Sequence, residues 1–77
     1  MILDRFNITY LSNYNNLLYE LNRLIDDNKT VLIFKVINNG NVIASIQYNS
    51  LVNSYVVYKF INKYKDNAQQ IDVYKKI

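Results

Sequence analysis

The sequence predicts an α+β fold in a single small domain that spans residues 1–77. Three patterns support this prediction: a helical stripe of apolar residues that begins near Ser12, a β-hairpin pattern around Gly40, and a second helical stripe that begins near Ser50. A chain of 77 residues with 51% hydrophobic residues, one Gly and no Pro has room for one hydrophobic core. The same composition is not that of a disordered chain.

The first predicted helix covers residues 12–27. Its apolar side chains recur at helical spacing and form one stripe of Tyr14, Leu17, Leu18, Leu21, Leu24 and Ile25. Ser12 is the expected N-cap, because its hydroxyl can accept hydrogen bonds from amides two or three residues later. Asp26, Asp27 and Asn28 end the pattern, and Asn tolerates the left-handed conformation that often follows a helix.

Residues 31–48 predict a β-hairpin. Asn39-Gly40 favours a type I′ turn, whose twist matches that of the flanking strands. The register expected from this turn pairs Ile37 with Val42, Lys35 with Ala44, Ile33 with Ile46 and Val31 with Tyr48 on one face, and Val36 with Ile43, Phe34 with Ser45 and Leu32 with Gln47 on the other. Both faces then carry apolar side chains. We expect later segments of the chain to cover the second face, with a second copy or a partner as alternatives.

The second predicted helix covers residues 50–65, with Asn49 or Ser50 as its cap. Its stripe consists of Val52, Tyr55, Val56, Phe60, Ile61 and Tyr64. Residues 71–77 then alternate apolar and polar side chains, which predicts a short C-terminal strand with Ile71, Val73 and Ile77 on one side. The N-terminal residues Ile2, Leu3 and Phe6 are consistent with an irregular arm or with an edge strand. We expect the hairpin to form the centre of the sheet.

The residue types exclude most familiar kinds of catalytic site. The chain has no His and no Cys, so it lacks imidazole and thiol chemistry, disulfides and zinc sites built from those residues. One Gly cannot build a glycine-rich phosphate loop. Asp26 and Asp27 are neighbours at a helix end and point in different directions, which is unsuitable for acid–base catalysis or metal binding. We expect a non-enzymatic protein with no catalytic residues, no metal site and no cofactor.

The abundance of Tyr favours a protein-binding module. The chain has 8 Tyr residues, Tyr is enriched in interface cores, and a core this small cannot bury so many phenol hydroxyls. The candidate partner-binding residues are Tyr10, Tyr19, Tyr58 and Tyr74, with Tyr14 and Tyr55 as further candidates that we expect to face the core. The outer strand of the hairpin also offers an unpaired edge, unless the C-terminal segment covers it.

The charge distribution supports a second hypothesis, that the protein binds nucleic acid. The formal net charge of +3 comes from the C-terminal half of the chain, where a candidate nucleic-acid-binding patch consists of Lys59, Lys63, Lys65, Lys75 and Lys76, with Tyr rings beside it for base stacking. The chain has only two Arg, which argues against readout of base edges. The third hypothesis is a homo-oligomeric structural or antitoxin-like protein, a homodimer that pairs through the second face of the hairpin.

Residues Lys35–Asn41, with the Asn-Gly turn, are followed by Ser50-Leu51-Val52 and Lys59-Phe60-Ile61. Together these segments resemble small anti-CRISPR proteins of phages and prophages, and are most similar to a compact αβββα inhibitor of a Cas nuclease. The resemblance implies a phage-encoded inhibitor without enzymatic groups, whose partner is a host protein or nucleoprotein complex such as a Cas effector. Because DNA-mimicking inhibitors are acidic and this chain is basic, the resemblance implies binding to an acidic or apolar effector surface, or to the guide RNA.

The location expected for the chain is the cytoplasm, or the host cytoplasm for a phage product. No apolar run approaches the roughly 18 residues of a membrane-spanning helix, and the residues after Met1 do not form a signal peptide. More than half of the chain is Asn, Ile, Tyr, Lys and Phe, whose codons are AT-rich, which indicates a source with a low-GC genome.

Overall fold

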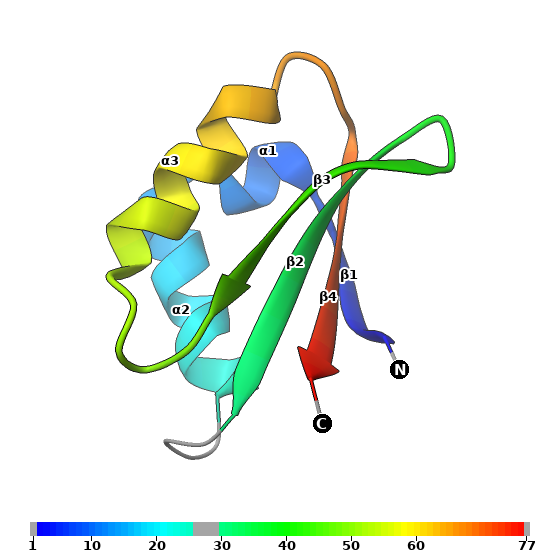
Figure 1. The fold of residues 1–77 in the computed structure, drawn as a ribbon. Helices are drawn as coiled ribbons and strands as arrows, with labels where there is room; N and C mark the ends of the chain where they lie inside the picture. The colour runs from blue at the N-terminus through cyan, green and yellow to red at the C-terminus, as the bar shows by residue number, and fades with distance from the viewer. Residues whose placement is uncertain (1, 26–29, 77) are drawn as a thin grey trace.

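The computed structural model describes residues 2–25 and 30–76 and has the predicted α+β fold. Its four-stranded antiparallel sheet has the strand order β1-β4-β2-β3, and the helices of the described residues lie on one face of that sheet (Figure 1). The strands are β1 (Ile2–Asn7), β2 (Val31–Asn38), β3 (Asn41–Tyr48) and β4 (Gln70–Lys76). The helices are α1 (Ile8–Leu11), α2 (Tyr14–Leu24) and α3 (Ser54–Tyr64).

The C-terminal strand occupies a central position in the sheet. The chain passes from β1 through α1 and α2 to β2, and β4 fills the gap between these two strands. The predicted C-terminal strand is therefore confirmed, and its residues Ile71 and Val73 are fully buried. The prediction that the hairpin forms the centre of the sheet is wrong, because β2 and β4 are central and β3 is an edge strand.

The N-terminal segment forms the other edge strand, β1, and not an irregular arm. A short helix that the sequence pattern did not predict, α1, follows it directly. The side-chain Oδ1 of Asn7 caps α1 by accepting a hydrogen bond from the Thr9 amide at 2.8 Å. Ile8 and Leu11 of this helix are buried, but four residues are too short to show a helical period.

The first predicted helix is present as α2, and its buried Leu17 and Leu21 confirm the predicted stripe. Its N-cap is Asn13 and not Ser12. The Asn13 Oδ1 accepts hydrogen bonds from the amides of Asn15 and Asn16 at 3.0 and 3.3 Å. Ser12 instead ends α1, where its hydroxyl donates to the Thr9 carbonyl at 2.7 Å. The helix ends at Leu24, where the C-cap Ile25 is extended, so the prediction that it continues to residue 27 was wrong; residues 26–28 themselves lie outside the described residues.

The second predicted helix is present as α3, but it begins at Ser54 with Asn53 as its cap, and not at Asn49 or Ser50. Its fully buried residues are Val57 and Ile61. Tyr55 and Val56 are 48% and 49% exposed, so the predicted stripe was wrong at these two positions. The run of apolar residues from Tyr55 to Tyr58 is compatible with more than one buried face, and the packing against the sheet selects Val57.

The predicted turn of the hairpin is confirmed, since Asn39 and Gly40 have φ values of 51° and 80°. The pairing of Ile37 with Val42 is also confirmed. Beyond this pair the register shifts by one residue at a β-bulge, because Val36 pairs with Ala44 and Ile43 falls between the two partners. The predicted pairs further from the turn were therefore wrong, and the observed ones are Lys35 with Ser45, Phe34 with Ile46, Ile33 with Gln47 and Leu32 with Tyr48.

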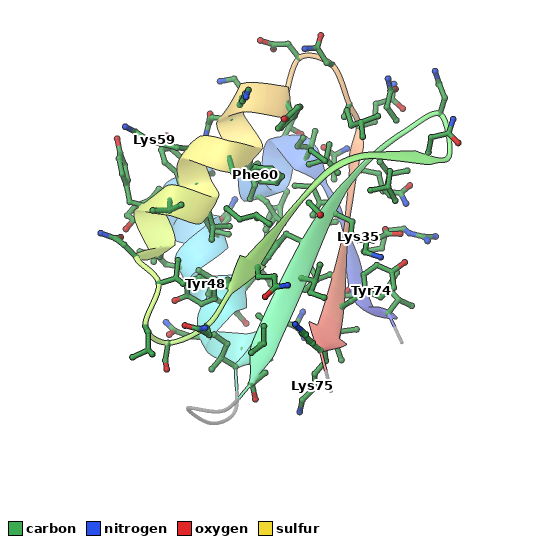
Figure 2. The ribbon with its side chains drawn as sticks, viewed as in Figure 1. Lys35, Tyr48, Lys59, Phe60, Tyr74 and Lys75 are labelled. Atoms are coloured by element: carbon green, nitrogen blue, oxygen red, sulfur yellow. The ribbon has the colours of Figure 1, made fainter. Side chains whose placement is uncertain are left out.

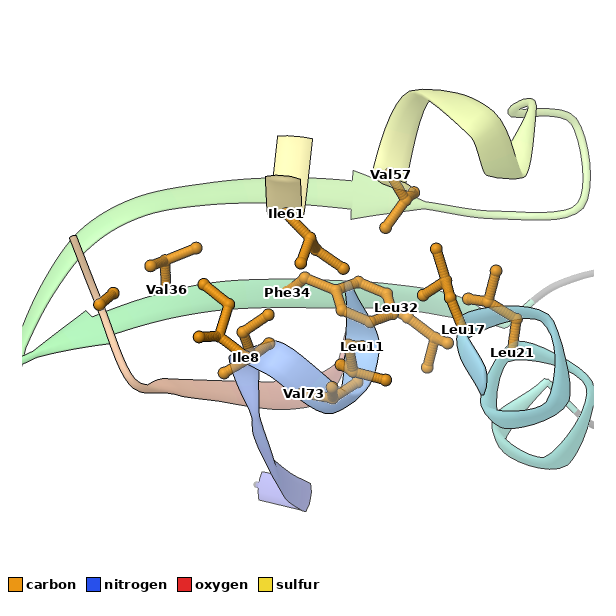
Figure 3. Packing of buried hydrophobic residues seen from close by; sticks show 12 residues of the cluster. Ile8, Leu11, Leu17, Leu21, Leu32, Phe34, Val36, Val57, Ile61 and Val73 are labelled. Atoms are coloured by element: carbon orange, nitrogen blue, oxygen red, sulfur yellow. The ribbon is translucent and has the colours of Figure 1, made fainter. Parts of the chain in front are cut away.

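The bulge changes which side chains share a face. Ile46 and Tyr48 move to the face of Leu32 and Phe34, because a shift of one residue turns every later side chain of β3 over. The helices cover this face and complete the core (Figure 3), which consists of Ile8, Leu11, Leu17, Leu21, Leu32, Phe34, Val36, Val57, Ile61, Ala68, Ile71 and Val73. Full burial of each large aliphatic side chain stabilises the fold by about 1.5–3 kcal/mol.

No helix of residues 2–25 and 30–76 lies on the second face of the sheet, so the prediction that later segments of the chain cover this face was wrong. On this face, one row of paired residues runs across all four strands and consists of Arg5, Asp72, Lys35 and Ser45. The centre of this face is therefore more polar than in the predicted register, which placed Ala44 and not Ser45 beside Lys35. This polarity explains why the face can remain in contact with water.

Candidate functional site

The tyrosines predicted to bind a partner lie in three separate regions. Tyr10 and Tyr19 belong to the first region, beside α2. The Tyr10 hydroxyl lies 3.5 Å from Glu20 Oε1, and the Tyr10 ring stacks near Phe6 with centroids 6.2 Å apart. Tyr19 is 57% exposed and lines a shallow depression with Asn22 and Arg23.

Tyr58 belongs to the second region, an aromatic cluster between α2 and α3. Its ring centroid lies 5.1 Å from that of Tyr14 and 5.5 Å from that of Tyr55. The Tyr14 hydroxyl shares a hydrogen bond of 3.1 Å with Ser54, and Lys59 Nζ lies 5.3 Å from the centroid of Tyr55. Tyr14 is half-buried, but Tyr55 is exposed, against the expectation that it faces the core. The cluster joins the two helices.

Tyr74 belongs to the third region, the uncovered face of the sheet. Lys35 Nζ lies 4.4 Å from the centroid of its ring (Figure 2). Beside them, Asp72 accepts hydrogen bonds from Arg5 Nε at 2.8 Å, Arg5 Nη2 at 3.2 Å and Gln70 Nε2 at 2.9 Å. The hydrogen bonds from Arg5 lower the pKa of the Asp72 carboxyl. The charged groups of this face are thus largely bonded to one another.

The five candidate lysines do not form one patch. Lys59 and Lys63 lie on α3, and Lys65 follows at its C-terminal end. Lys75 and Lys76 lie at the C-terminal end of β4. The other end of this strand, Gln70, is the one close to α3 in the chain, and it lies about 20 Å from Lys76. Figure 2 shows Lys59 and Lys75 in different parts of the molecule.

Carboxylates on the side of β1 are bonded to arginines. Arg23 donates to Glu20 Oε2 from Nε at 2.9 Å and from Nη2 at 2.7 Å, and it also pairs with Asp4. The hydrogen bond from Arg23 lowers the pKa of Asp4. Among residues 2–25 and 30–76, no group of three or more acidic side chains is arranged to hold a metal ion. The Arg23–Asp4 pair joins α2 to β1.

The outer edge of β3 is an unpaired sheet edge, which the sequence indicated without showing whether the C-terminal segment covers it. β3 pairs with β2 on one side, and no described strand pairs with its other side. Its eight residues, Asn41–Tyr48, include no charged residue and no Pro, and its bulge lies near the turn. Val42 and Ile43 are 54% and 43% exposed. The opposite edge strand, β1, carries Asp4 and Arg5 instead.

Helix α3 borders this edge on the covered side of the sheet. Val56, Phe60 and Lys63 lie four and then three residues apart, so they share one stripe of the helix. Figure 2 shows Phe60 between α3 and β3, whereas Lys59 points away from the sheet. We define the β3 edge site as Asn41–Tyr48 together with Val56, Phe60 and Lys63. It combines backbone groups that no described strand pairs with, an apolar flank and the cation of Lys63, which shares the stripe of Phe60 and lies with its Nζ 5.5 Å from the centroid of the Tyr64 ring.

The signal in the sequence that points to the β3 edge site is the unpaired outer strand of the predicted hairpin. The missing information was the position of β4, because a C-terminal strand beside β3 would have closed the site. The Tyr count pointed to other parts of the surface.

Comparison of the chain with protein-family models, with curated proteins and with solved structures gives no significant match. In the part of the chain that the structure describes, no helix is both long enough and apolar enough to span a membrane. The function is therefore inferred from the sequence and structure of this protein alone.

Proposed function

We propose that this protein is a non-enzymatic protein-binding module that adds an extended segment of its partner to the β3 edge. The observation that carries the proposal is the uncharged, eight-residue edge strand without a neighbour among the described residues. Natural edge strands are usually protected by charged residues or Pro, and an edge without them is a template for pairing with another chain. Proteins that recognise extended peptides use edges of this kind.

The geometry of an added strand supplies both affinity and selectivity. In an antiparallel sheet every second residue of an edge strand directs its N–H and C=O outward, so β3 offers about four such residues. Each backbone hydrogen bond contributes about 0.5–1.5 kcal/mol. Val42 and Ile43 add apolar surface on the strand itself, and Phe60 adds it on the helix side. Backbone pairing alone would bind many sequences, and these side chains restrict the choice.

The proposal includes the inhibitor role that the resemblance to anti-CRISPR proteins implies. A small protein of this kind inhibits by occupying a surface that its target needs, and strand addition gives it a way to do so without any reactive group. The target on this proposal is a host protein of a defence complex. The partner is then retained by backbone pairing and apolar contact, which high salt does not abolish.

The experiment is capture of partners from a lysate of a low-GC bacterium, with and without nuclease, by the tagged protein and two double variants. Ile43→Glu with Ser45→Glu places two negative charges on exposed positions of β3. Asn15→Glu with Asn22→Glu adds the same charge on exposed positions of α2 and is the matched control. Thermal unfolding verifies that both variants are folded.

The expected result is a defined protein that survives nuclease and 0.5 M salt, is lost with the β3 variant and is retained by the α2 variant. Equal retention by both variants would exclude the β3 edge as the binding site. Loss of every partner after nuclease would instead favour nucleic-acid binding through the lysines.

A further inference from the structure

We infer that the segment received by the β3 edge site is acidic, with carboxylate side chains alternating with apolar ones. This inference rests on the proposed function and specifies the chemistry of the partner. It follows from the charges around the edge, which are all of one sign over a long part of the chain.

The sequence from Thr30 to Lys65 contains no Asp and no Glu. This span includes β2, β3 and α3, the three elements that surround the edge. Its charged residues are Lys35, Lys59, Lys63 and Lys65. A partner segment beside β3 therefore meets cations and no anion from these elements.

The described carboxylates outside this span leave the charge around the edge positive. Asp72 lies directly opposite Lys35, but it also accepts two hydrogen bonds from Arg5, so the row of Arg5, Asp72 and Lys35 keeps one net positive charge. Asp72 is two strands, about 10 Å, away from Ser45. Asp66 lies beyond the C-terminal end of α3, in the turn before β4. Asp4 and Glu20 are paired with Arg23 on the side of β1, the opposite edge of the sheet.

The two sides of an added strand meet different surfaces. Side chains directed toward the helix layer meet Phe60 and Val56, which favours apolar residues. Side chains directed toward the uncovered face lie beside Ser45 and Gln47, with Lys35 one strand further in. Because side chains of a strand alternate between the faces, a segment with apolar and acidic residues in alternation matches both. Lys63 at the rim attracts additional carboxylates that flank the segment.

The same charges disfavour a second copy of the chain as the occupant. Pairing of two β3 strands about a two-fold axis brings two α3 helices to one side of the joined sheet, each with Lys59 and Lys63 and without an acidic residue. Like charges brought together oppose association. The lysines of α3 attract an acidic partner, whereas they repel the lysines of a second copy.

The test is titration of the full chain with blocked synthetic peptides of about ten residues, a length that covers a typical strand. One peptide alternates Val and Glu, and two comparison peptides carry Gln or Lys in place of Glu. The readouts are the dissociation constant and the hydrogen exchange of the β3 amides. Lys63→Glu is the test variant, and Lys76→Glu, an exposed residue at the far end of β4, is the matched control.

We expect the Glu peptide to bind at least about fivefold more tightly than the Gln peptide, and the Lys peptide to bind most weakly. Binding should protect alternate β3 amides from exchange. Lys63→Glu should weaken binding of the Glu peptide roughly tenfold, and Lys76→Glu less than about twofold, because screening limits the reach of a distant charge.

Equal binding of the Glu and Gln peptides, with β3 amides protected, would overturn the acidic specificity and leave the proposed strand addition standing. An equal effect of Lys63→Glu and Lys76→Glu would also overturn it, as a response to net charge alone. Protection of β3 without peptide, rising with protein concentration together with a mass near twice 9.2 kDa, would assign the edge to a second copy. Displacement of the Glu peptide by an oligothymidine strand would assign the lysines to nucleic acid.

Discussion

Arg5 and Asp72, which are 67 residues apart in the chain, form a two-point ion pair across β1 and β4. The Arg5 side chain is 62% exposed, whereas that of Asp72 is only 6% exposed. The carboxylate is therefore enclosed, with Gln70 as an additional donor, and the guanidinium covers it from the solvent side. This pair joins the first strand of the chain to the last and completes the edge of the sheet opposite β3.

Asp72→Asn should destabilise the protein by about 1–2 kcal/mol, because the neutral amide weakens the charge-assisted hydrogen bonds from Arg5 in a site with little water. The measurement is the free energy of unfolding in urea at pH 7. Asp66→Asn removes a carboxylate from an exposed turn and is the control, with an expected change within about 0.5 kcal/mol. Equal effects of the two variants would show that the enclosed pair has no special role.

The stability should depend on pH in the acid range. The hydrogen bonds from Arg5 lower the pKa of Asp72, and those from Arg23 lower the pKa of Asp4, below the ordinary value of 3.8. A carboxylate with a lowered folded-state pKa stabilises the fold fully at pH values above its unfolded pKa. That contribution disappears as the pH falls through the folded-state pKa, since the unfolded chain takes up protons first.

The urea midpoint of the wild type is thus expected to stay nearly constant from pH 7 to about pH 5 and to fall below about pH 4. The difference between wild type and Asp72→Asn should shrink over the same acid range. A difference that remains unchanged down to pH 2 would contradict the assignment of this pKa shift to the ion pair.

Gly40→Ala should destabilise the hairpin by about 1–2 kcal/mol, because an L-residue with a Cβ is strained at positive φ. Gly40 has a φ of 80°, and no atom outside its neighbours lies within 4 Å of an added Cβ, so the cost is conformational and not steric. Asn41→Ala, an exposed position after the turn, is the control for side-chain loss. Urea unfolding of both variants measures the difference, and a neutral Gly40→Ala would argue against the type I′ turn.

Two leucines separate core packing from surface exposure. Leu32 is 0% exposed and Leu51 is 93% exposed. Leu32→Ala should cost about 2–5 kcal/mol because it leaves a cavity in the core, whereas Leu51→Ala should change stability by less than about 0.5 kcal/mol. Thermal unfolding followed by circular dichroism is sufficient to distinguish them. If Leu32→Ala does not fold, Leu32→Val gives a smaller decrease of the same sign.

The sequence was informative where a structural signal is local. Helical spacing identified α2, and the Asn-Gly dipeptide identified the turn of the hairpin with its first pair. Alternation identified β4 as a strand. The sequence did not distinguish the capping residues, because several Asn and Ser residues lie near each helix start; in the structure Asn13 and Asn53 are the caps.

The candidate site was less predictable than the fold. The counts of Tyr and Lys do not contain the distances between them, and the structure places Tyr19, Tyr58 and Tyr74 on different surfaces. The unpaired hairpin edge was visible in the sequence, but its availability depended on where the C-terminal strand would pair. The outer edge of β3 can bind another strand only because β4 pairs between β1 and β2 and not beside β3.

The sequence by itself determined the two longer helices, α2 and α3, the type I′ turn and the absence of thiol and imidazole chemistry, because these follow from residue type and short-range spacing. Only the tertiary structure decided the strand order, the β-bulge at Ile43 and the face of the sheet that the helices cover. A shift of one residue exchanges the two faces of a strand at no local cost, so the choice depends on which face buries more apolar surface. That comparison involves Leu17, Phe34 and Val73, which are distant in the chain and meet only in the folded core.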